Sequence, residues 1–193
     1  MRAVESLPEG YEEILSLDLN NDKKKKALIQ GFALLIAAVL VVPMCFLVPI
    51  SSMFSMDDGL GVYFLRFGVM LALMVAYVIL HELVHGVAMK ICGTKKVKYG
   101  FTLLYAFAGS DDYYGKWEYL FIALAPVVFW GIVIAIINPF VSTAWFWVVY
   151  LIQIINLSGA AGDIYVTVKF CKLPKDVLIK DAGTSMKVFA KSK

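Results

Sequence analysis

Two histidines and one glutamate are the residues of this chain best suited to metal chemistry. The sequence of 193 residues contains two histidines, and both lie in the segment His81-Glu82-Leu83-Val84-His85. On a helix, this spacing places the two imidazoles one turn apart on the same face, where both can bind one zinc ion. Glu82 can then reach a metal-bound water as a general base. The alternative is a pair of hydrogen-bonded histidines with a structural glutamate, but such a triplet in an apolar helix is costly unless paired or metallated.

A catalytic zinc site needs a third protein ligand and leaves the fourth position to water. Most of the fifteen acidic residues lie in tails and loops, whereas Asp163 lies well inside an apolar segment. Glu118, at the edge of another apolar segment, is the weaker candidate. His81 and Asp163 each follow the start of their segment by about 20 residues, so both are expected about 30 Å along parallel helices. We therefore predict His81, His85 and Asp163 as ligands, with a lone carboxylate facing a polar crevice as the alternative for Asp163.

Asn156 is a candidate for binding substrate. It precedes Asp163 by seven residues, which places it on the same helix face two turns away. Its amide could hydrogen-bond a substrate carbonyl or an oxyanion. A hydrogen bond between two helices is an equally good interpretation.

The elements that must position these residues are membrane helices. Hydrophobic residues make up 61% of the chain and charged residues 17%, with a mean hydropathy of +0.77. Four apolar stretches reach the length of about 20 residues that crosses a bilayer, at 27–50, 60–93, 119–137 and 143–170. We predict an all-α membrane protein with four transmembrane helices, in which residues 1–26 and 171–193 are cytoplasmic segments and 27–170 form the membrane domain.

The lysines predict the orientation. They occur before the first stretch (Lys23 to Lys26), between the second and third, and after the fourth, whereas the loops 51–59 and 138–142 contain neither lysine nor arginine. Basic loops stay in the cytoplasm, so both termini are expected on the cytoplasmic side. The expected location of the protein is a bacterial cell membrane. The net charge of +3 is too small to indicate nucleic-acid binding.

The loop between the second and third stretches has a partial period of two. Val97, Tyr99 and Phe101 alternate with lysine and glycine. This pattern is typical of a short strand or β-hairpin. An amphipathic connector is the alternative.

Taken together, these motifs resemble the three-helix core of site-2-type intramembrane metalloproteases. More closely, the chain resembles the small bacterial DUF3267 family of zincin-type peptidases, through Leu7-Pro8-Glu9-Gly10-Tyr11, the first span and the segment from Gly159 to Asp163. The resemblance implies zinc at His81, His85 and Asp163, Glu82 as catalytic base, and a hairpin that adds substrate as an extra strand. One departure concerns the third ligand: site-2 proteases have a proline and an Asp-Gly pair there, whereas Asp163 is followed by isoleucine.

The function predicted from these observations is zinc-dependent intramembrane proteolysis. The substrate would be a membrane-anchored protein that is cut near the cytoplasmic face. The alternative is a non-catalytic membrane zinc protein, either a pseudoprotease scaffold or a metal carrier. A carrier is expected to have several metal sites along a path, whereas this chain has one cluster and retains the glutamate.

Overall fold

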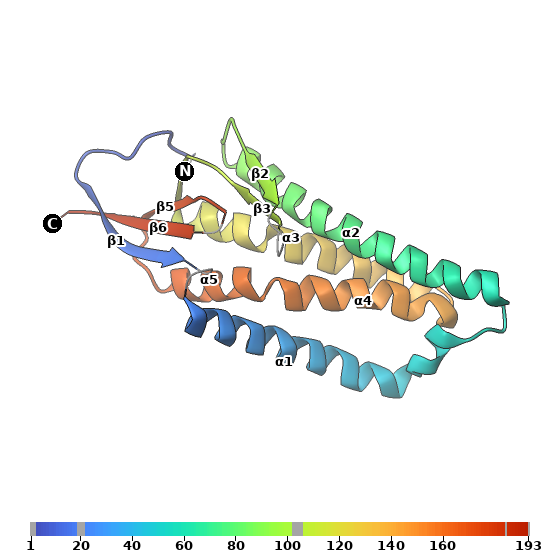
Figure 1. Ribbon diagram of the computed structural model, residues 1–193. Helices are drawn as coiled ribbons and strands as arrows, with labels where there is room; N and C mark the ends of the chain where they lie inside the picture. The colour runs from blue at the N-terminus through green and yellow to red at the C-terminus, as the bar shows by residue number, and fades with distance from the viewer. Residues whose placement is uncertain (1–2, 19–21, 102–105, 184, 193) are drawn as a thin grey trace. The chain divides into compact units, whose positions relative to one another are not determined.

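The computed structural model describes residues 3–18, 22–101, 106–183 and 185–192. Within these ranges, the chain is mostly helical and has four helices that are long and apolar enough to cross a membrane. Helix α1 is Lys23–Leu47, α2 is Leu60–Ile91, and α3 is Lys116–Ile137, extended by a short 3-10 helix, Asn138–Phe140 (Figure 1). Helices α4 (Thr143–Gly159) and α5 (Ala161–Cys171) make up the fourth. The four predicted spans are confirmed as helices of this kind.

The prediction of an all-α protein is wrong, because the described residues also form two antiparallel sheets. The larger has the order β1-β6-β5-β4, where β1 is Tyr11–Asp18, β4 is Tyr113–Gly115, β5 is Leu178–Asp181 and β6 is Ser185–Lys191. Strands β1 and β6 come from opposite ends of the chain, and Tyr11 pairs with Lys191. This sheet therefore depends on pairing between distant segments, which hydropathy does not reveal.

The second sheet is a hairpin between α2 and α3. Strand β2 (Lys98–Phe101) pairs with β3 (Ala106–Gly109), with Tyr99 opposite Ala108. The alternating pattern predicted a strand or hairpin here, and the structure has one. The connection at 102–105 lies outside the described residues.

The chain divides into two compact units. The first comprises Met1–Ile29, His81–Pro126 and Gly162–Lys193. Its core joins one face of the four-stranded sheet to the ends of three helices, and includes Met89 of α2, Ile122 of α3, Phe170 of α5, and Ile179 and Val188 of the sheet. Each such buried side chain stabilises the fold by about 1.5–3 kcal/mol relative to exposure to water.

The second unit comprises Gln30–Leu80 and Val127–Ala161 and is entirely helical apart from its connections. Its buried residues include Trp147, Tyr150 and Ile154 of α4, and Tyr77 of α2. Many large apolar side chains of this unit are exposed, such as Phe46 at 86%. In a membrane these side chains would face lipid, which fits the predicted spans.

The fourth predicted span is interrupted rather than continuous. Helix α4 ends at Gly159, and its last turn closes through a hydrogen bond from the Ala160 amide to the Asn156 carbonyl. Helix α5 then begins at Ala161, so Asp163 lies in its first turn. The break coincides with the boundary between the two units and assigns Asp163 to the first.

Candidate metal centre

Helix α2 presents both histidines to one place in the first unit. It runs without interruption from Leu60 to Ile91, and the rings of His81 and His85 lie one turn apart with centroids 5.0 Å from each other. Both side chains are largely buried, at 13% and 12% exposure. This is the arrangement that the spacing predicted.

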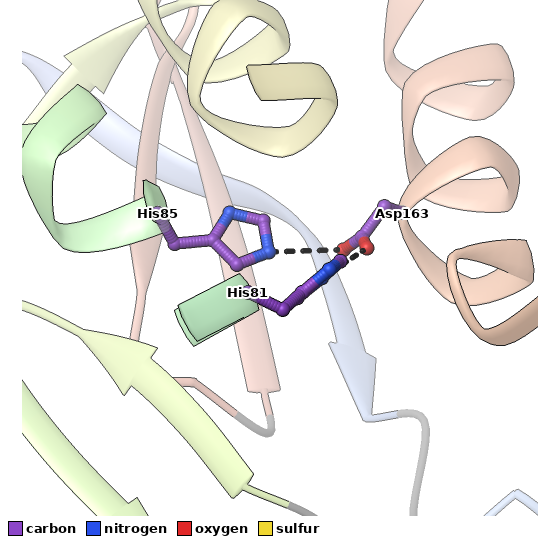
Figure 2. A group of neighbouring side chains, drawn as sticks. All are labelled: His81, His85 and Asp163. Atoms are coloured by element: carbon purple, nitrogen blue, oxygen red, sulfur yellow. Dashed lines mark ion pairs between the residues drawn. The ribbon is translucent and has the colours of Figure 1, made fainter. Parts of the chain in front are cut away.

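Asp163 of α5 completes a three-residue cluster (Figure 2). Its carboxylate oxygens lie 3.6 Å from His81 Nε2 and 3.8 Å from His85 Nε2. Zinc bonds of about 2.0–2.2 Å at tetrahedral angles would separate neighbouring donor atoms by about 3.3–3.6 Å. The ligand atoms of the three side chains, one from each residue, lie within 4.8 Å of one another. These two nitrogens and one carboxylate oxygen would fit a zinc ion after the side chains move toward one another by about 1 Å. Asp163 stays 29% exposed, which leaves one side of the cluster accessible.

A hydrogen bond on the side of the ring opposite Asp163 fixes the orientation of His85. Its Nδ1 lies 2.9 Å from the carbonyl oxygen of Ile122 on α3. A carbonyl can only accept, so Nδ1 carries a proton, and in the neutral imidazole Nε2 then keeps its lone pair. Nε2 is also the atom that faces Asp163. A backbone acceptor behind a histidine is the usual means of setting the tautomer that a metal requires.

Glu82 of α2 contacts the hairpin. Its carboxylate accepts a hydrogen bond from the backbone N–H of Ala108 on β3. The hairpin also rests on α2 itself, because a Cβ placed at Gly86 would overlap the Tyr99 hydroxyl. Gly86 follows Glu82 by one turn and therefore lies on the same face. The hairpin thus lies along the face of α2 that carries Glu82.

A buried carboxylate that the sequence analysis missed also belongs to the first unit. Asp181 of β5 is 8% exposed, and it accepts hydrogen bonds from the Tyr119 hydroxyl at 2.9 Å and the Gly183 N–H at 2.7 Å. Burial raises the pKa of Asp181 to about 6; these hydrogen bonds and the charge of His85 oppose the increase, and Asp163 adds to it. In the sequence, Asp181 is one acid in a lysine-rich tail, and no local pattern singles it out.

Two other candidates are not members of the cluster. Glu118 is in the first turn of α3, where its carboxylate lies against Gly115, and it is not among the clustered ligands found in the described ranges. Asn156 belongs to the second unit and is fully buried. Its amide oxygen accepts from the Tyr77 hydroxyl, and its amide nitrogen donates to the Val127 carbonyl. These are hydrogen bonds between helices, as the alternative interpretation expected, and a role in substrate binding stays a prediction.

Comparisons with known proteins are consistent with a peptidase. The DUF3267 family, described as "Putative zincin peptidase", matches residues 74–178, which include the histidines, Glu82 and Asp163. A protein of Pyrococcus woesei named "Uncharacterized 24.7 kDa protein in gap 5'region" is 31% identical over 119 residues, 59% of this chain and 51% of the relative. The chain thus spans about half the length of that relative. No solved structure matches the chain.

Proposed function

Because the chain belongs to the DUF3267 family of zincin-type peptidases, we propose that it is a zinc-dependent intramembrane metallopeptidase. One observation carries the proposal: ligands from two helices, some eighty residues apart in sequence, have their donor atoms within 4.8 Å of one another. A carboxylate that could act as base lies beside them on α2. Membrane spans of this length and hydropathy support an intramembrane site.

His81, His85 and Asp163 would hold the zinc ion. When bound, zinc supplies Lewis-acid polarisation of the scissile carbonyl and a water of lowered pKa. Glu82 takes the proton of the attacking water and returns it to the leaving amine. Ile122 holds the ring of His85, and Ala108 holds the carboxylate of Glu82, so both groups are oriented before substrate arrives.

The substrate would bind as an extended strand beside β3. Along a strand of an antiparallel pair, the backbone N–H and C=O groups of one residue bond to the partner strand, and those of the next residue point away from it. Ala108 directs its N–H to Glu82, away from β2, and Ala106 has the same parity. The Ala108 N–H is held by Glu82, so the groups on this edge of β3 that a peptide would pair with are those of Ala106 and the Ala108 carbonyl. Backbone pairing of this kind gives affinity without sequence preference.

The proposed substrates are membrane-anchored proteins, since the catalytic residues lie on helices that can span a bilayer. A substrate helix must unwind there, because helical hydrogen bonds occupy its carbonyls. The lysine distribution supports termini in the cytoplasm and cleavage near that face. A bacterial cell membrane as the location stays a prediction.

The test compares newly formed peptide termini in membranes of cells that express the wild type, Glu82→Gln or Glu118→Gln. Glu118→Gln is the matched control, because it makes the same chemical change on α3 outside the cluster. We expect new termini with the wild type and Glu118→Gln, and none with Glu82→Gln, while all three purified proteins contain zinc. Zinc in all three with identical termini would reject the peptidase and favour the non-catalytic zinc protein.

A further inference from the structure

The hydrogen-bonded pair Tyr119–Asp181 lies at the junction of the elements that carry the candidate site. Tyr119 is 2% exposed and Asp181 is 8% exposed. The proposed mechanism uses neither residue. Burying a carboxylate is costly, so its retention in this core calls for an explanation in its contacts.

Through α3, the pair supports His85. Tyr119 precedes Ile122 by three residues, so their contacts hold the same turn of α3. The Tyr119 hydroxyl is anchored on Asp181 at 2.9 Å, and the Ile122 carbonyl accepts from His85 Nδ1 at 2.9 Å. A rotation of α3 about its axis would therefore break both contacts together.

Through α5, the pair supports Asp163. The ring of Tyr119 packs on Phe170 with centroids 5.5 Å apart. Phe170 follows Asp163 by seven residues, or two turns, and lies on the same face. The contact fixes how α5 is rotated, and so where Asp163 points.

Through β3, the pair supports Glu82. The Asp181 carbonyl accepts from the amide of Ser110, the residue directly after β3, at 3.0 Å. Its carboxylate also holds the Gly183 N–H at 2.7 Å in the turn between β5 and β6. A Cβ at Gly109 would come within 2.9 Å of that turn, so β3 is packed directly on it. Ala108, which binds Glu82, is the preceding residue.

We propose that Asp181, acting with Tyr119, is a positioning residue that aligns both metal-binding helices and the Glu82 hairpin. The inference rests on the proposed metal centre. An aspartate suits this role because two donors, one hydroxyl and one backbone N–H, converge on it and need two acceptor oxygens. An asparagine offers one such oxygen and would satisfy the junction in part.

The test measures zinc affinity and the visible spectrum of the cobalt-substituted protein, using the full chain in detergent. Asp181→Ala is expected to weaken zinc binding by about 10-fold or more and to alter the cobalt bands, because loss of supporting groups typically costs 10–100-fold in affinity. Asp181→Asn should retain part of the zinc affinity and part of the wild-type cobalt spectrum. Tyr119→Phe keeps the packing on Phe170 and removes the hydroxyl alone, so it repeats the test if Asp181→Ala fails to fold.

Val188→Ala is the matched control, since it opens a cavity in the neighbouring strand of the same core. It should lower the unfolding temperature and leave zinc affinity and the cobalt spectrum unchanged. The inference is rejected if Asp181→Ala and Tyr119→Phe both match the wild type, or if Val188→Ala produces the same loss of affinity. A wild type that binds no zinc contradicts the proposed function itself, and the inference with it.

Discussion

Replacing Asp181 by asparagine should change how the stability of the metal-free protein depends on pH. The pKa of Asp181 is raised from 3.8 to about 6 by burial, with Asp163 of α5 adding to the increase, and Tyr119 of α3, the Gly183 N–H and His85 of α2 opposing it. When the pKa of an acid is higher in the folded state than in the unfolded state, the acid contributes stability that is fully present below the unfolded-state pKa. This stability is lost as the pH rises through the folded-state pKa. The relevant window is therefore from about pH 4 to 7.

The size of the effect follows from the shift. A difference of about 2 pKa units between the folded and unfolded states corresponds to a total loss of about 3 kcal/mol in the free energy of unfolding. About 2 kcal/mol of this loss occurs between pH 4.5 and 7.5. Between pH 4.5 and 7.5, the unfolding temperature of the wild type should therefore decrease by about 4–8 °C more than that of Asp181→Asn. The assay is thermal unfolding of both proteins in detergent with a chelator present. Parallel curves for the two proteins would refute the reasoning, because they would show that Asp181 does not titrate in this window.

Two further predictions concern packing. Gly86→Ala should push the ring of Tyr99 off α2 and, with zinc retained, reduce cleavage by up to about 100-fold. Gly68→Ala, on the same helix with no atom within 4 Å of the added Cβ, should change nothing. Lys116 donates from Nζ to the carbonyls of Cys171 and Leu173 at 2.6 and 2.7 Å, so Lys116→Met should cost about 1.5–3 kcal/mol of stability. The exposed Lys172→Met should cost under about 0.5 kcal/mol. Equal cleavage by the two glycine variants would contradict the role of the contact between Tyr99 and Gly86. Equal stability of the two lysine variants would contradict the role of the hydrogen bonds from Lys116.

The parts of the fold that sequence analysis predicted are those encoded locally. Hydropathy over about 20 residues is enough to identify a membrane helix, and it located all four. The spacing of His81 and His85 is a property of a single helix. Asp163 could be named as a candidate because an acid in an apolar segment is conspicuous. Asp163 and His81 lie at similar distances along their segments, which predicted that the two side chains would lie close together.

The parts that were missed depend on distant contacts. Strands β1 and β6 lie near opposite ends of the chain, and they form a sheet because Tyr11–Asp18 pairs with Ser185–Lys191 across nearly the whole chain. Asp181 is significant only through that sheet, which buries it against α3. Lys116 is one of the lysines between the second and third apolar stretches that predicted the orientation. It is 5% exposed and caps the end of α5. The interruption between α4 and α5 lies among small apolar residues that hydropathy reads as continuous.

The measurement that tests the account most directly is the zinc content of the detergent-purified wild type beside Glu82→Gln, His81→Ala and Asp163→Ala. The account predicts about one zinc per chain for a single three-ligand site, retained in Glu82→Gln and lost or strongly weakened in the other two. Full zinc content in Asp163→Ala would show that α5 does not supply the third ligand. A wild type prepared without chelators that contains no zinc would contradict the metal centre altogether.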